Sequence, residues 1–86
     1  MRLRPGVTFT SVDEAAVLLD ERTGRYLQLN ATATLVLRSL LAGGDPAGAA
    51  GDLARAHPAA APTAEADVAA FLAQLREAGL IEEEQR

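Results

Sequence analysis

The stretch from Gly24 to Leu40, GRYLQLNATATLVLRSL, changes its hydrophobic period in the middle and leaves no room for a loop. In its first half, apolar and polar side chains alternate, which is typical of a half-buried strand. Asn30 is a common helix-capping residue, and the apolar side chains after it recur at helical spacing. The chain is therefore expected to pass directly from a strand over 25–29 into a helix over 31–41.

Two further strands are predicted ahead of this junction. Residues 7–11 alternate and are rich in β-formers, and residues 15–20 contain the short apolar run AAVLL. The segments around Asp13 and Gly24 suit turns, because Asp is common in turns and Gly adopts a positive φ without strain. Three sequential strands over 7–11, 15–20 and 25–29, joined by short turns, predict an antiparallel meander.

Two more helices are predicted downstream. Asp45–Pro46 provides a cap and a first-turn proline for a helix over 46–57, although two glycines in its interior weaken it. The proline-rich segment 58–62 is interpreted as a linker. Thr63 is the expected cap of a third helix over 64–78, which carries a clear apolar stripe that includes Phe71.

The predicted order is thus three strands followed by three helices. A small sheet must cover one face with helices, so we expect a single α+β domain over 1–86, with a winged-helix-like fold: a three-stranded antiparallel β-meander followed by three α-helices. After the last helix, Gly79 suits a C-terminal cap, and Leu80–Ile81 can fold back as an apolar plug. Glu82–Glu84 is interpreted as a solubilising tail.

Catalytic and metal chemistry find little support in the sequence. The chain has no Cys, and its only His, His57, has no partner at metal-ligand spacing. We therefore expect no enzyme activity, no cofactor and no metal. The N-terminal segment lacks a secretory apolar region and no run is long enough for a membrane span, so a cytoplasmic protein is expected.

Nucleic-acid binding is disfavoured by charge. The net charge is −4 and the arginines are scattered, whereas phosphate contacts usually require a basic stripe. A three-stranded meander, however, has edge strands, and an exposed edge can accept an extended peptide as a further strand. The alternative from the residues alone is a short edge that binds nothing.

The pattern around the strand–helix junction resembles that of the PqqD family. Leu18-Leu19-Asp20, then Gly24 to Asn30, then Thr32 are similar to its strand–turn–Gly–aromatic–x–x–Leu–Asn–x–Thr pattern. The C-terminal segment resembles the last helix and "GLI" ending of the family at Val68, Phe71, Leu72, Leu75, Gly79, Leu80 and Ile81. The similarity is weakest over 43–62, and the aromatic residue frequent in the first helix of the family is missing.

The resemblance implies a role in recognising the leader of a ribosomally made, post-translationally modified precursor peptide. It implies that the leader pairs with the third strand and lies in a groove against the third helix. The corresponding residues here are Arg25, Tyr26, Leu27, Gln28, Leu29, Asp67, Ala70, Phe71 and Gln74. Leu29 is expected to point to the core, and Phe71 is as readily a core residue as an anchor for the peptide.

The family serves several pathways. The overall character of the chain favours lasso-peptide biosynthesis, in which the partner is a separate leader peptidase, a transglutaminase-like cysteine protease. The alternatives are a partner of a radical-SAM peptide-modifying enzyme, including the pyrroloquinoline quinone pathway, and a winged-helix DNA-binding regulator. We expect a monomer or weak dimer.

Overall fold

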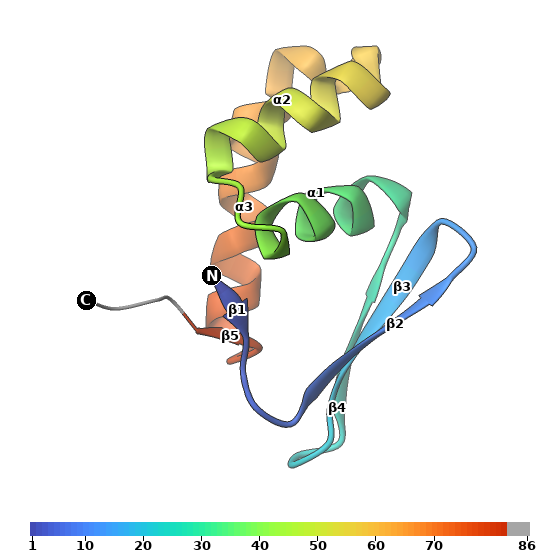
Figure 1. The fold of residues 1–86 in the computed structure, drawn as a ribbon, viewed down its shortest axis with the longest axis vertical. Helices are drawn as coiled ribbons and strands as arrows, with labels where there is room; N and C mark the ends of the chain where they lie inside the picture. The colour runs from blue at the N-terminus through green and yellow to red at the C-terminus, as the bar shows by residue number, and fades with distance from the viewer. Residues whose placement is uncertain (83–86) are drawn as a thin grey trace.

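The computed structural model describes residues 1–82 and shows a three-stranded antiparallel sheet followed by helices (Figure 1). The sheet has the order β2-β3-β4, and its strands are β2 (Val7–Val12), β3 (Ala15–Asp20) and β4 (Arg25–Leu29). The α-helices are α1 (Ala31–Leu41), α2 (Pro46–Ala56) and α3 (Ala64–Glu77). The α+β class and the meander-then-helices order expected from the sequence are confirmed.

The β3–β4 turn is held by a buried carboxylate. Asp20 is only 2% exposed, and its carboxylate accepts hydrogen bonds from the Arg22 guanidinium at 3.2 and 3.0 Å and from the Arg22 backbone N–H at 3.0 Å. The hydrogen bond from the Arg22 side chain is the main reason that the pKa of Asp20 is lowered, against the opposing effect of burial. Gly24 closes the turn at φ 77°, and its N–H donates to the Asp20 carbonyl. This turn determines where β4 starts.

Asn30 makes the direct strand-to-helix junction possible. Its side-chain oxygen accepts the Ala33 N–H at 2.9 Å, and its backbone carbonyl accepts the Thr34 N–H at 2.9 Å and the Thr34 hydroxyl at 2.8 Å. The bond to Ala33 satisfies one of the N–H groups that a helix N-terminus leaves unpaired, and the bond from the Thr34 N–H is the first regular bond of the helix. α1 therefore begins one residue after β4 and packs on the inner side of β3 and β4.

The segment interpreted as a linker is a 3₁₀-helix, η1 (Pro58–Thr63). Proline fixes φ near the helical value, so a proline at the first position of such a turn is compatible with it. Thr63 stands at the N-cap of α3, but its hydroxyl donates to the Asp67 carboxylate at 2.9 Å and caps no backbone N–H. α2 ends at Ala56 and α3 at Glu77, one residue earlier than expected in each case.

A second, two-stranded sheet was not predicted. β1 (Arg2–Leu3) pairs with β5 (Ile81–Glu82), and Arg2 forms an ion pair with Glu82 at 3.2 Å. Strands of two residues carry no hydrophobic period, so sequence patterns cannot reveal them. Figure 1 shows this pair at the foot of α3, where Leu80 and Ile81 are buried. Of the expected acidic tail, Glu83 and Glu84 lie outside the described residues.

The core lies between the inner side of the sheet and the three α-helices. α2 packs against both α1 and α3, and the largest fully buried side chains are Leu18, Thr34, Leu37, Val68 and Leu75. Within residues 1–82, no helix is long and apolar enough to cross a lipid bilayer.

Candidate peptide-binding site

β4 forms one edge of the three-stranded sheet, with β3 as its neighbour. The register shows which of its backbone groups are already used. The Glu21 N–H donates to the Gly6 carbonyl on the β2 side, whereas the Asp20 carbonyl accepts from Gly24 on the β4 side. In an antiparallel strand the N–H and C=O of one residue point to the same neighbour, and successive residues point to opposite neighbours.

By this alternation, Tyr26 and Gln28 are the residues of β4 whose backbone groups point to the open edge. Counting back from Asp20, the residues of β3 that face β4 are Leu18 and Ala16, which lie opposite Leu27 and Leu29. The N–H and C=O groups of Tyr26 and Gln28 therefore point away from β3. An extended peptide laid along β4 would hydrogen-bond at these two residues.

The side chains of β4 divide between the two faces of the sheet. Leu27 and Leu29 lie opposite Leu18 and Ala16 on the inner face, and Leu29 is buried in the core at 4% exposure. Tyr26 and Gln28 point to the opposite face. Tyr26 is 66% exposed, so its side chain is free to contact another molecule.

A first pocket separates the start of β4 from the C-terminal half of α3. We call it the lower pocket; its volume is about 540 Å³. It is lined by Gly24, Arg25, Tyr26, Leu27, Gln74, Glu77, Ala78 and Leu80. α3 ends at Glu77, and the buried Leu80 follows it at this pocket. The lower pocket combines an apolar floor with one cation and one anion at its rim.

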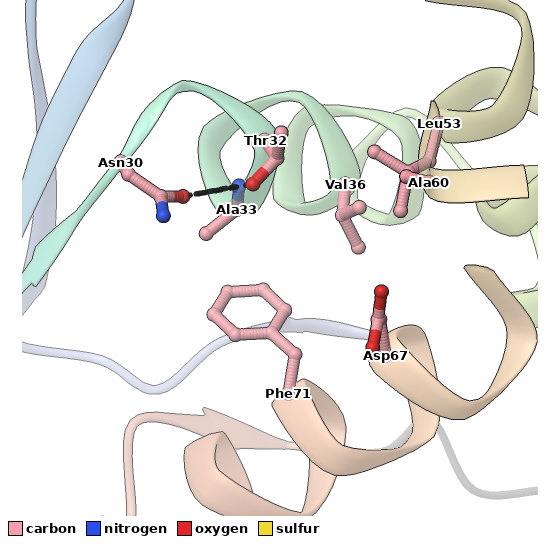
Figure 2. A pocket seen from close by; sticks show the side chains of 8 residues that line it. All are labelled: Asn30, Thr32, Ala33, Val36, Leu53, Ala60, Asp67 and Phe71. Carbon is pink, nitrogen blue, oxygen red and sulfur yellow. Dashed lines mark hydrogen bonds between the residues drawn. The ribbon is translucent and has the colours of Figure 1, made fainter. Parts of the chain in front are cut away.

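A second pocket, the upper pocket, lies between α1 and α3 and has a volume of about 210 Å³. Its lining residues are Asn30, Thr32, Ala33, Val36, Leu53, Ala60, Asp67 and Phe71. Figure 2 shows the Phe71 ring pointing from α3 toward Ala33 on α1, and the Asp67 carboxylate pointing toward the Val36 and Ala60 side. The upper pocket is thus apolar, with a carboxylate and the Asn30 amide at its border.

One flank of α3 serves both pockets. Asp67, Phe71, Gln74 and Ala78 are spaced by three or four residues, so they lie on one side of the helix. The first two line the upper pocket and the last two line the lower pocket. The two pockets therefore lie along one flank of α3, the upper one toward α1 and the lower one toward the start of β4, and together with the β4 edge we call them the groove.

The structure brings together only some of the residues predicted for the site. Arg25, Tyr26, Leu27 and Gln74 meet in the lower pocket, and Asp67 and Phe71 line the upper pocket. The other three lie elsewhere: the Gln28 side chain is on the outer face of the sheet, Leu29 is in the core, and Ala70 is exposed and lines neither pocket. That any of them contacts a peptide stays a prediction.

The part of the groove contributed by α1 was not predicted from the sequence. Thr32, Ala33 and Val36 line the upper pocket, and the adjacent Asn30 caps the helix. The Asn-x-Thr pattern directly after a strand was the available signal, because it places polar residues where the helix meets the sheet. Within residues 1–82 there is no group of three or more His, Cys, Asp or Glu side chains that could hold a metal ion.

Comparisons with known proteins agree with this arrangement. A search of solved structures finds a lasso peptide synthetase B1 complexed with the leader peptide, at 40% sequence identity and a TM-score of 0.85, covering 95% of this chain and 96% of that one. It also finds TbiB1 in complex with the TbiA(beta) leader peptide, at 26% identity and a TM-score of 0.81, covering 99% of this chain and 100% of that one. No curated protein matches significantly.

The family comparison covers most of the chain. The model of the family described as coenzyme PQQ synthesis protein D (PqqD) matches residues 15–81, which include β3, β4, all three α-helices and both pockets of the groove. With this coverage, and with a structural relative at 40% identity, the chain belongs to the PqqD family.

Proposed function

We propose that this protein captures the leader of a ribosomally made precursor peptide by adding it to the sheet as a strand beside β4. The observation that carries the proposal is the open β4 edge, where Tyr26 and Gln28 present unused backbone groups next to a groove lined by one flank of α3. The two structural relatives are each described in complex with a leader peptide, which supports the same kind of ligand here.

The two faces of the added strand would meet different surroundings. Peptide residues opposite Leu27 direct their side chains into the groove, and residues opposite Tyr26 and Gln28 direct theirs to the outer face. The groove would select alternate residues of the leader. The upper pocket suits an apolar side chain, because its centre is formed by Val36, Leu53 and Phe71.

We place this function in lasso-peptide biosynthesis, because the structural relative at 40% identity is described as a lasso peptide synthetase B1. In this role the protein is a non-catalytic partner: it holds the leader while a separate cysteine peptidase removes it. A radical-SAM enzyme is the alternative partner, since the family description itself refers to coenzyme PQQ synthesis. The two alternatives differ in the enzyme that acts on the precursor peptide once this protein holds its leader.

The first test is a titration of a fluorescently labelled leader, followed by anisotropy. We expect saturable binding with a Kd at or below about 1 μM, which corresponds to about −8 kcal/mol. An 86-residue chain is accessible to chemical synthesis, so one backbone N–H can be methylated without changing any side chain. N-methylation at Gln28 should weaken binding at least tenfold.

The matched control uses the other edge of the same sheet. By the same alternation Ser11 of β2 points its N–H away from β3, so its N-methylation removes an equivalent donor far from the groove. This variant should bind the leader as the unmodified protein does. Equal affinities for all three proteins would show that the leader does not pair with β4.

A further inference from the structure

The outer face of the sheet, which is the face turned away from the helices, carries no charged side chain (Figure 1). The strand register places eight residues on this face: Thr8, Thr10, Val12, Ala15, Val17, Leu19, Tyr26 and Gln28. The opposite face of the same strands includes Asp20 and Arg25. The lack of charge is therefore a local property of the outer face.

Tyr26 combines a large apolar surface on the outer face with a place on the open edge. Its side chain is 66% exposed, and Leu19 of β3, which is 36% exposed, lies directly opposite it in the ladder. Thr8 of β2 lies opposite Leu19, so Thr8, Leu19 and Tyr26 form one row across the three strands. The row ends at β4, beyond which the three-stranded sheet has no further strand among residues 1–82. A strand added beside β4 would place its own side chain at the end of this row.

The backbone of Tyr26 determines where that side chain would lie. Its N–H and C=O point to the open edge, so the leader residue that exchanges both hydrogen bonds with Tyr26 lies directly opposite it. The Cα atoms of such a pair are about 5.5 Å apart, and the two side chains point to the same face. The Tyr26 ring is then within reach of a leader side chain that projects away from both pockets of the groove.

We propose that Tyr26 determines leader specificity from the outer face, by packing against an apolar side chain of the leader residue that pairs with it. This inference rests on the proposed function and adds a second selected face to the leader. Aromatic residues stabilise cross-strand pairs with aromatic and β-branched neighbours. A charged leader side chain at this position would find no opposite charge among the eight residues of the outer face.

The leader residue that pairs with Gln28 meets different surroundings. Its neighbours in the row are the Gln28 amide and, one strand further, Val17. The amide of Gln28 both donates and accepts hydrogen bonds, so it is compatible with polar leader side chains. The outer face of the leader should therefore carry an apolar residue opposite Tyr26, with a polar residue tolerated two positions away.

Disulfide trapping identifies the leader residue that lies opposite Tyr26. The chain contains no Cys, so the variant Tyr26→Cys carries a single thiol. Synthetic leaders of the precursor made together with this protein, each with one Cys at a different position, are mixed with this variant in a glutathione redox buffer. The position that cross-links fastest is the paired one, because a disulfide requires Cα atoms about 4.4–6.8 Å apart. We expect an aromatic, β-branched or leucine residue at that position of the native leader.

A charge swap then tests the contact by anisotropy. Tyr26→Ala should weaken binding of the native leader about threefold to fivefold, which is the range of a good cross-strand pair. Asp at the paired position of the leader should weaken its binding to the unaltered protein about fivefold. The variant Tyr26→Arg should bind this Asp leader about fivefold more tightly than the unaltered protein does, because opposite charges then lie opposite each other. A loss that came only from lower stability of the fold would not be rescued in this way.

Two matched controls belong to the same face. Val12→Ala removes another exposed apolar side chain, on β2 and away from the β4 edge. On the leader, Asp is placed at the position opposite Gln28 instead of the position opposite Tyr26. Each control should change the affinity less than twofold.

Three results would overturn the inference. One is a charged residue at the paired position of the native leader; a Lys or Arg there would indicate a cation–π contact with the Tyr26 ring instead. Another is an unchanged affinity of the Tyr26→Ala variant for the native leader. The third is a Tyr26→Arg variant that binds the Asp leader no better than the unaltered protein. Failure of the unaltered protein to bind any leader is a different outcome, which refutes the proposed function itself.

Discussion

Leu27 lies directly opposite Leu18 in the β3–β4 ladder, on the inner face of the sheet and with its backbone groups turned toward β3. Its neighbour Gln28 turns its backbone groups toward the open edge. Two adjacent residues therefore have different roles: the backbone of Leu27 holds the sheet together, and the backbone of Gln28 is available to a ligand.

Proline substitutions should separate these two roles. Gln28→Pro removes an unused donor, so we expect the free energy of unfolding to change little and leader affinity to fall at least tenfold. Leu27→Pro breaks a bond within the sheet and should lower the free energy of unfolding by about 1–3 kcal/mol. Urea unfolding and leader anisotropy measure the two effects. If Leu27→Pro leaves stability intact, the assigned register is wrong.

Phe71→Ala should weaken leader binding at the upper pocket. The ring points across the pocket toward α1 and is only partly buried, so its removal takes away ligand contacts more than core packing (Figure 2). We expect about a tenfold loss of affinity, which is about 1.4 kcal/mol. The control is Val68→Ala, on the core side of the same helix at 1% exposure. It should lower stability and leave the affinity of the folded protein unchanged.

The Asp20–Arg22 pair should make the stability of the folded protein depend on pH in the acidic range. Because Arg22 lowers the folded-state pKa of Asp20 below its ordinary value of 3.8, the stabilisation is present above pH 3.8 and is lost as the pH falls through the folded-state pKa. We expect the Tm of the wild-type protein to drop in this range. Asp20→Asn should flatten that part of the Tm–pH profile between pH 2 and 5.

Arg22→Gln is the complementary change. It leaves the buried Asp20 carboxylate without its main partner, so we expect a lower Tm at pH 7 and a smaller difference from wild type in acid. A deficit in Tm that is the same at pH 7 and pH 2.5 would show that the pair does not act through the charge of Asp20.

Replacement by Ala should change the free energy of unfolding in opposite directions at two glycines. Gly51 is inside α2, where a Cβ would meet only the flexible end of the Arg55 side chain at 3.4 Å. Gly51→Ala should therefore raise the free energy of unfolding by about 0.5–1 kcal/mol. A Cβ on Gly44 would lie 2.9 Å from the Ser39 carbonyl oxygen, so Gly44→Ala should lower stability. Thermal unfolding of the two variants measures both effects.

Much of the fold could be predicted because each main element carries its own periodic pattern. The alternation over 25–29, the cap at Asn30 and the apolar stripe after it correctly predicted a strand followed at once by α1. The same approach failed where no period exists. The two-residue strands β1 and β5 depend on a contact between segments 80 residues apart, and the proline-rich segment interpreted as a linker is the 3₁₀-helix η1.

The site could be predicted only in part. Local patterns indicated β4 and α3, but the flank of α3 that faces the strand depends on how α2 and η1 orient that helix. Ala70 and Phe71 are adjacent in sequence, yet Ala70 is exposed outside both pockets and Phe71 points toward α1. The apolar stripe of this helix does not reveal which of its members face a groove and which face the core.

The sequence by itself determined the order of the elements, the direct strand-to-helix junction and the resemblance to the PqqD family, because these depend on neighbouring residues. Only the tertiary structure decided that Tyr26 and Gln28 hold the free backbone groups of the edge, that α1 contributes three of the eight residues lining the upper pocket, and that the exposed large apolar residues share the outer face. Those features depend on register and on packing between distant segments. A one-residue shift in register would reverse both the face and the edge assigned to every residue of β4.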